Sequence, residues 1–317
     1  MHLDTRKRIG QLDVSPLVLG GNVFGWTADT PTSFAVLDAY TGSGGNMIDT
    51  ADVYSAWVEG NHGGESETVI GEWLAARGSA VRDNVVIATK AGHHPDHMGL
   101  APATLKAACE DSLRRLRTDR IDLYYTHFDD ESVPVAEIIG TLDTLVKEGK
   151  VREIAASNLS PERLTASLAA SDSEGLARYV ALQPHYNLVS RDTYEGALRD
   201  IAQRESLAVL PYYALASGFL TGKYRPGEPA PEGARADKAA QHLATERGQR
   251  VLAALTAVAD AHGTSEATVA LAWLAAQPTV TAPIASARTP DQLPALLATP
   301  DLHLTQEELH LLTTASG

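Results

Sequence analysis

The strongest constraint on the fold of this chain is a repeated alternation of two kinds of segment. Short apolar runs rich in Val, Ile and Leu are followed, again and again, by segments of helical periodicity. This order is typical of βα units that build a parallel sheet. Strands are predicted at residues 17–20, 47–49, 85–89, 122–126, 153–156, 179–182, 208–211 and 280–284. Eight strands joined by seven crossovers favour a closed (β/α)8 barrel, also called a TIM barrel.

Turn and cap signals predict the elements around these strands. Residues 8–15 predict an opening β-hairpin, and helices are expected at residues 66–74, 103–115, 135–148, 249–262 and 265–276. Ser160 followed by Pro161 predicts a further helix start, because Ser is a favoured N-cap and Pro suits the first helical position. Since no linker divides the chain, we expect residues 1–317 to form a single domain.

One interval breaks the regular spacing. About seventy residues separate the last two predicted strands, whereas a usual connection has about 2 to 6 residues. The interval begins with a Gly/Pro-rich stretch at residues 218–233 and continues with two of the predicted helices. A long loop on the carboxyl face of a barrel is a candidate lid. We therefore expect a lid and extra helices between the seventh and eighth strands.

Composition limits the classes of partner. With 317 residues and 44% hydrophobic content, the chain can bury a large core, and its net charge of −14 argues against nucleic acid or an anionic membrane as a partner. No run is long and apolar enough to span a bilayer, and no signal-peptide pattern follows the N-terminal charges, so a cytoplasmic location is expected. The single cysteine, Cys109, excludes an intramolecular disulfide and is expected to be a buried apolar filler.

Four polar residues suggest proton chemistry: Asp49, Tyr54, Lys90 and His127. Three of them stand where an apolar run ends, and a barrel of parallel strands builds its active site at the carboxyl ends of its strands. Taken singly, such residues are more often structural, because a strand-end Asp commonly caps a helix. Together they resemble an acid catalyst. We expect the Lys90 ammonium to lower the pKa of the Tyr54 phenol, and Asp49 to keep Lys90 charged.

These residues lie in sequence blocks that resemble the aldo-keto reductase superfamily. The blocks occupy residues 46–54, 87–90, 122–127, 156–158, 182–188 and 218–223, in the family's order and over nearly the whole chain. The resemblance implies NADPH-dependent reduction of an aldehyde or ketone to an alcohol, without metal or flavin. In this scheme Tyr54 is the general acid, Asp49 and Lys90 tune it, and His127 orients the substrate.

The same resemblance implies a cofactor site. Ser157, Asn158 and Gln183 would hold the nicotinamide amide, and Tyr212 would stack on its ring. The remaining positions are expected beside the first βα loop, the pyrophosphate and the adenosine phosphate: Gly21, Leu215, Ser217, Leu220, Lys223, Ser286, Arg288 and Gln292. A helix starting near Thr289 would add free N–H groups to Arg288. Arg288 favours the 2′-phosphate of NADPH, which makes NADH the less favoured cofactor.

Aromatic residues after strand ends predict a substrate wall. Trp26, Trp57 and Phe128 are expected in this wall, whereas Trp73 and Trp273 lie on apolar helix faces and are expected in the core. The histidine-rich segment 93–97 is expected in the loop after the third strand, without the helical i, i+4 geometry of many metal sites and without a second cluster of ligands. We therefore expect His93 to line the substrate pocket instead.

Two other functions fit the same sequence. One is a cofactor-binding regulatory subunit with little turnover, as in the barrel-shaped β subunits of potassium channels. The other is a Schiff-base lyase that uses Lys90 as its nucleophile. Sugars, nucleotide-linked ketosugars, aromatic aldehydes and polyketide ketones all fit as substrates, and no pattern defines the oligomeric state.

Overall fold

The protein folds around a curled sheet of eight parallel strands. The computed structural model describes residues 3, 5–225, 227 and 236–317. The strands of the sheet are β3 (Val18–Gly20), β4 (Met47–Asp49), β5 (Val86–Ala91), β8 (Ile121–Thr126), β9 (Val151–Ser157), β10 (Tyr179–Gln183), β11 (Ala208–Val209) and β12 (Ile284–Ala285). Their order in the sheet is β11-β10-β9-β8-β5-β4-β3-β12. This is the predicted (β/α)8 fold.

The two ends of the sheet meet through short backbone contacts. Val209 and Val280 form an isolated parallel bridge, and the Ile284 N–H donates to the Pro211 carbonyl at 3.0 Å. The last predicted strand, 280–284, was placed too early, because the observed strand begins at Ile284. Pro283 has no N–H to donate to a ladder, so the regular strand forms only after it. Pro211 shortens the seventh strand in the same way.

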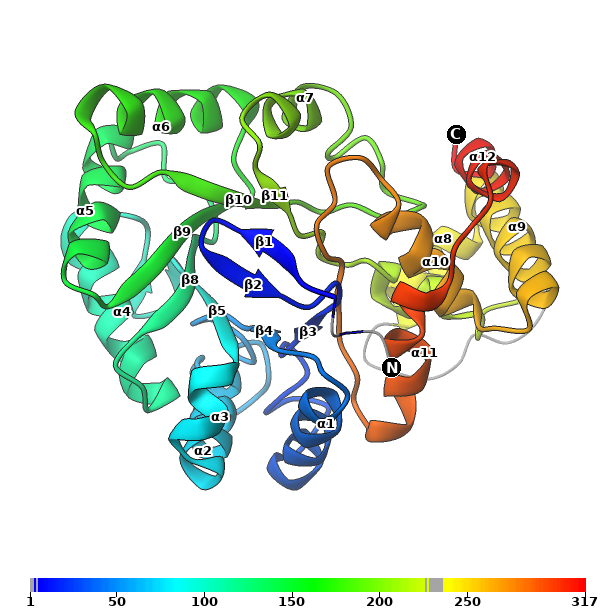
Figure 1. The fold of residues 1–317 in the computed structure, drawn as a ribbon, viewed down its shortest axis with the longest axis horizontal. Helices are drawn as coiled ribbons and strands as arrows, with labels where there is room; N and C mark the ends of the chain where they lie inside the picture. The colour runs from blue at the N-terminus through cyan, green and yellow to red at the C-terminus, as the bar shows by residue number, and fades with distance from the viewer. Residues whose placement is uncertain (1–2, 4, 226, 228–235) are drawn as a thin grey trace.

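Helices surround the sheet on its outer face (Figure 1). The first seven are α1 (Thr30–Gly42), α2 (Glu65–Arg77), α3 (Ser79–Asn84), α4 (Pro102–Leu116), α5 (Val135–Lys147), α6 (Pro161–Glu174) and α7 (Ala197–Arg204). The Ser160 hydroxyl accepts a hydrogen bond from the Arg163 N–H, which confirms the predicted cap of α6. Trp73 and Trp273 are fully buried in the core, also as predicted. Strands covered on both faces explain the nearly continuous apolar runs of the sequence.

The long interval before β12 is mostly helical. It holds η1 (Ala216–Thr221), α8 (Ala236–Leu243), α9 (Glu246–His262) and α10 (Glu266–Ala275), so both predicted helices are confirmed and α8 is additional. Much of the candidate lid, residues 226 and 228–235, lies outside the described residues. The chain ends with η2 (Pro290–Gln292), α11 (Leu293–Leu297), η3 (Thr299–Asp301) and α12 (Gln306–Ala315).

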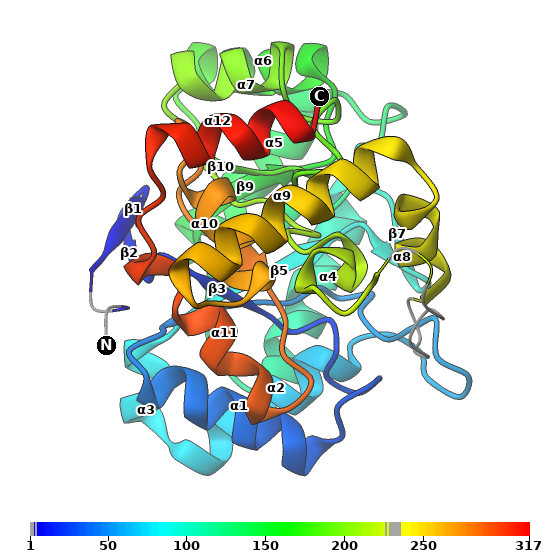
Figure 2. The same cartoon turned by 90° about the vertical axis from the view of Figure 1, so that its right-hand side faces the viewer.

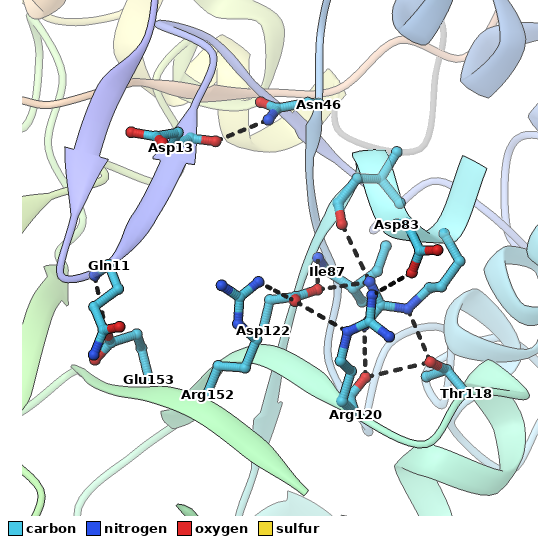
Figure 3. A network of polar contacts seen from close by, with 12 residues as sticks. Gln11, Asp13, Asn46, Asp83, Ile87, Thr118, Arg120, Asp122, Arg152 and Glu153 are labelled. Carbon is cyan, nitrogen blue, oxygen red and sulfur yellow. Dashed lines mark hydrogen bonds and ion pairs between the residues drawn. The ribbon is translucent and has the colours of Figure 1, made fainter. Parts of the chain in front are cut away.

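A hairpin and a charged network cover the amino-terminal end of the barrel. The predicted hairpin consists of β1 (Lys7–Ile9) and β2 (Leu12–Val14) and lies across the centre of the strand ring in Figure 1. Beside it, the buried Asp122 carboxylate accepts from the Ile87 N–H at 2.9 Å and from the Arg152 guanidinium at 3.1 Å (Figure 3). The hairpin therefore covers this end of the barrel.

No helix in the described part of the chain is long and apolar enough to cross a membrane.

Candidate active site

A large cavity lies at the carboxyl ends of the strands. Its volume is about 1020 Å³, and residues from the strand ends, the following loops and α8 line it. Figure 2 shows α8 on the opposite side of the molecule from the hairpin β1–β2. The cavity therefore occupies the face on which a parallel barrel presents catalytic side chains.

The four predicted catalytic residues meet in and behind the wall of this cavity. The Lys90 Nζ atom donates to the Asp49 carboxylate at 2.7 Å, to the Thr50 carbonyl at 2.7 Å and to the Tyr54 hydroxyl at 2.9 Å. Asp49, Tyr54 and His127 line the cavity, whereas the Lys90 side chain is 1% exposed and lies behind the phenol. The phenol thus stands between a buried cation and the open space of the cavity.

Burial changes the titration of this pair from the sequence-based expectation. Burial tends to lower the pKa of Lys90, but the charges of Asp49 and Tyr54 outweigh it, so this pKa is raised. The pKa of Tyr54 is also raised, because burial of the phenol outweighs the opposing effect of Lys90. Lys90 does act to lower the Tyr54 pKa, as expected, but the net shift is upward because burial has the larger effect. Both groups hold their protons at neutral pH.

His127 stands next to the phenol as a neutral imidazole. Its ring lies 6.1 Å from the Tyr54 ring and stacks on Phe128 at 4.8 Å. Burial, followed by the charges of Lys90 and His93, lowers the pKa of His127 well below its usual value. Its Nδ1 atom is buried and has no hydrogen-bond partner among the described residues. The ring is therefore held by packing more than by hydrogen bonds.

The residues predicted for the nicotinamide amide form one hydrogen-bonded group. The Ser157 hydroxyl donates to the Gln183 carbonyl at 2.9 Å, and the Asn158 amide donates to the Ser157 hydroxyl at 3.0 Å. The Tyr212 hydroxyl donates to the Asn158 side-chain oxygen at 2.8 Å. Gln183 also donates to Asp49 at 2.8 Å, which links this group to the catalytic residues. The three residues predicted for the amide and the stacking residue Tyr212 all line the cavity.

The predicted stacking residue, Tyr212, has one face stacked on His185 at 5.4 Å. The other predicted cofactor residues divide into two sets. Six of them line the cavity: Leu215, Ser217, Lys223, Ser286, Arg288 and Gln292. Gly21 and Leu220 do not line the cavity: a side chain at Gly21 would meet the Asp49 carbonyl, and Leu220 is buried in the core. The sequence therefore predicted which segments lie at the cavity, but not which of their residues face it.

The structure also differs from the prediction that a helix starts near Thr289. Pro290 begins a three-residue 3-10 turn, and α11 that follows has five residues. The Arg288 N–H, one of the expected free donors, is occupied by the Gln292 side chain at 2.8 Å. Pro294, which has no N–H to donate, lies in the first turn of α11. This part of the site therefore depends on the Arg288 side chain more than on a helix terminus.

Comparison with known proteins places the chain in a family. Residues 16–316 match the aldo/keto reductase family. The chain belongs to this family. It is 33% identical to Protein tas of Escherichia coli, over 94% of this chain and 93% of that protein. It is 34% identical to the uncharacterized oxidoreductase YrpG of Bacillus subtilis, over 95% of this chain and 92% of that protein. It is also 30% identical to the aryl-alcohol dehydrogenase [NADP(+)] of Phanerodontia chrysosporium, over 95% of this chain and 82% of that protein. As a member, it is an NAD(P)H-dependent oxidoreductase that acts on small carbonyl compounds.

In this aldo/keto reductase the expected substrate wall borders the cavity. Trp26, Trp57, His93 and Phe128 all line it. The His93 ring lies 4.5 Å from the Phe128 ring, and Trp26 meets Trp57 edge to face at 5.5 Å. Cys109, by contrast, is buried between the barrel and its helices, and burial raises the pKa of its thiol to about 12.

Four residues line the cavity but were not among the predicted site residues: Tyr213, Tyr224, Lys238 and Ser265. Asn22, which also lines it, lies in the first βα loop, which was expected beside the cofactor and substrate. Tyr213 directly follows the predicted stacking residue, and this adjacency was an available signal. Lys238 lies on α8, for which no cap or periodicity signal was recognised. Its approach to the cavity depends on tertiary packing of α8 against η1.

Proposed function

We propose that this enzyme reduces an aldehyde or ketone to an alcohol with NADPH, and that Tyr54 donates the proton. The observation that carries the proposal is the 2.9 Å hydrogen bond from Lys90 to the Tyr54 hydroxyl at the cavity wall. A protonated phenol that faces the cavity, with a cation behind it, suits proton donation to a carbonyl oxygen. The cofactor, when bound, supplies the hydride.

The buried charges around Tyr54 favour this transfer. When the phenol gives up its proton, a phenolate forms beside the Lys90 ammonium, and this ion pair stabilises it. Asp49 keeps the ammonium charged and fixed through the 2.7 Å ion pair. The preorganised charges need little reorganisation during the reaction. His127, neutral because of burial, orients the carbonyl oxygen as a hydrogen-bonding partner and adds no competing positive charge.

The lining fits a nicotinamide nucleotide. Ser157, Asn158 and Gln183 offer amide and hydroxyl groups that match a carboxamide, and Tyr212 offers a ring for stacking. Leu215, Ser217 and Lys223 would border the pyrophosphate. Ser286, Arg288 and Gln292 would hold the adenosine phosphate, and the Arg288 guanidinium suits a 2′-phosphate. The Phanerodontia chrysosporium relative, an aryl-alcohol dehydrogenase [NADP(+)], supports the same preference.

The geometry disfavours a Schiff-base role for Lys90. A nucleophilic lysine must be neutral and must reach its substrate. Here the ammonium makes three hydrogen bonds behind Tyr54, and its pKa is raised. A regulatory subunit with little turnover would keep the same cofactor pocket, so turnover itself separates that alternative from the proposal.

The test is NADPH oxidation over a panel of aldehydes and ketones, with Tyr54→Phe as the variant. Loss of a general acid is expected to lower kcat by about 10²- to 10⁴-fold, whereas NADPH still quenches protein fluorescence. Tyr179→Phe serves as a control, because it removes a buried phenol that pairs with Thr126 and does not line the cavity. Full activity of Tyr54→Phe on the best substrate would contradict the assignment. Tight NADPH binding with no turnover of any carbonyl would favour the regulatory subunit.

A further inference from the structure

Aromatic rings that remain exposed gather around the substrate end of the cavity. Among the described residues, the exposed large hydrophobic side chains are Trp57, Met98, Phe128, Tyr213 and Leu311. Three of these five, Trp57, Phe128 and Tyr213, line the cavity, with exposures of 51%, 39% and 39%. Exposed aromatic surface that converges on a cavity indicates a binding surface. These rings offer flat apolar walls close to Tyr54.

The charges of the lining are unusual for so acidic a chain. Its described members include three cations, Lys223, Lys238 and Arg288, and a single carboxylate, Asp49. Asp49 is already neutralised by the buried Lys90. In a protein of net charge −14, this lining therefore attracts anions. The proposed cofactor accounts for two of these cations, because its phosphates would lie near Lys223 and Arg288.

Lys238 is the third cation, and it lies on the substrate side. Its Nζ atom is 5.9 Å from the centre of the Tyr213 ring. Tyr213 in turn lines the same cavity as the proposed acid and lies close enough to contribute to the raised pKa of Tyr54. The backbone of Tyr213 has a positive φ of 53°, which is rare for an aromatic residue and marks a constrained turn. The ammonium, the Tyr213 ring and the Tyr54 phenol thus border the same part of the cavity.

We infer that the substrate is an aromatic carbonyl compound that carries a carboxylate: its ring lies against the Trp57, Phe128 and Tyr213 walls, and Lys238 binds the carboxylate. The inference rests on the proposed function, because it places the carbonyl at Tyr54. A flat ring gains from packing against aromatic walls. A carboxylate gains a charge-assisted hydrogen bond from the lysine. Together the two contacts would orient the carbonyl group.

Matched substrates provide the test. The kcat/KM of the purified enzyme with NADPH is measured for 4-carboxybenzaldehyde, for its 3-isomer, and for the neutral methyl 4-formylbenzoate and benzaldehyde. We expect at least one carboxylated aldehyde to be preferred over the neutral ones by about five- to tenfold, the range of a partly exposed charge-assisted contact. Lys238→Gln is expected to abolish this preference, and Lys238→Arg to retain it. Added salt should weaken the preference of the wild type.

Controls separate this inference from its alternatives. Lys106→Gln makes the same change of charge on α4, away from the cavity, and should keep the wild-type preference. Equal losses on carboxylated and neutral aldehydes in Lys238→Gln would overturn the inference. So would weaker NADPH binding that accounts for the loss, because the lysine would then serve the cofactor. If the wild type reduces aldehydes but does not prefer carboxylated ones, the inference is wrong while the proposed function stands. If the wild type reduces no aldehyde, the proposed function itself is contradicted.

Discussion

At the scale of single residues, burial decides the charge state of the proposed catalytic group. Lys90 and Asp49 are almost completely buried and form one ion pair, so each neutralises the charge of the other. Removing one partner of a buried pair leaves an unpaired charge in a medium of low polarity, which costs about 3 to 5 kcal/mol. Removing both partners avoids that penalty. The pair therefore predicts a non-additive effect on stability.

The first prediction is that Asp49→Asn/Lys90→Met is more stable than Lys90→Met alone. Lys90→Met leaves the Asp49 carboxylate without its cation, whereas the double variant leaves two neutral side chains. Urea unfolding of the wild type, both single variants and the double variant gives the coupling free energy. Additive effects would contradict a buried charge pair. Both Lys90 variants should reduce the same carbonyl substrates poorly.

The second prediction concerns Asp52, a buried carboxyl that the proposed reaction does not use. Burial, with the nearby charge of Glu67, raises the pKa of Asp52 to about 8, although Arg115 opposes the shift. An unfolded Asp titrates near about 4, so between about pH 4 and pH 8 only the folded state keeps the proton. The contribution of Asp52 to stability therefore falls as pH rises through this window.

Asp52→Asn, which imitates the protonated acid, should remove this pH dependence. We expect its Tm to exceed that of the wild type at pH 8 and the difference to shrink toward pH 5. Glu67→Gln is a matched comparison in the same cluster, because Glu67 accepts from Thr89 at 2.6 Å and from Arg115 at 2.7 Å. That variant should be destabilised at both pH values. A pH-independent Tm difference for Asp52→Asn would refute the assignment.

The sequence predicted which residues meet at the site better than it predicted their electrostatics. Asp49, Lys90 and His127 follow apolar runs, and the carboxyl ends of parallel strands converge, so their proximity could be inferred. The sign of the Tyr54 pKa shift could not be inferred, because it depends on how completely the folded chain covers the phenol. The position of Gly21 outside the cavity lining and the approach of Lys238 to the cavity also depend on tertiary packing.

At the scale of elements, long periodic segments were predictable and short strands were not. The helices α4 and α5 were predicted within a few residues, since periodicity and caps act locally. By contrast, β12 has two residues, and its position is set by Pro283 and by pairing with β3. The three residues after Thr289 form a 3-10 turn for a comparable reason: Pro294 interrupts the helix close to its start.

The third prediction concerns the charged network that joins the strands under the hairpin. Asp122 is 1% exposed and pairs with Arg82 at 2.9 Å and Arg152 at 3.1 Å. Asp122→Ala leaves the buried Arg82 without its anion, so we expect a loss of about 3 to 5 kcal/mol in the free energy of unfolding. Asp13→Ala removes an exposed ion pair with Arg8 in the same region and should cost under about 1 kcal/mol. Similar losses in both variants would contradict the role of burial.

At the scale of the whole molecule, an acidic chain has a cavity whose lining is locally positive. The net charge of −14 repels phosphates at a distance, whereas Lys223, Lys238 and Arg288 attract them at the cavity. Binding to the folded state alone raises stability, by about 2.7 kcal/mol when the ligand is at 100 times its Kd. The proposed cofactor should therefore be detectable as a shift in Tm without any knowledge of the substrate.

The fourth prediction is that NADPH raises the Tm more than NADH does, and that Arg288 is responsible. The two cofactors differ only by the 2′-phosphate, so any difference in their Tm shifts at equal concentration reports the contact with that group. Arg288→Gln should reduce the NADPH shift toward the NADH value and leave the NADH shift nearly the same.

Arg199→Gln, an equal change of charge on α7, should keep both wild-type shifts, since Arg199 does not line the cavity. Because the proposed contact is ionic and Arg288 is exposed, higher ionic strength should reduce the difference between the NADPH and NADH shifts in the wild type. Equal shifts for NADPH and NADH in the wild type would show that Arg288 confers no preference.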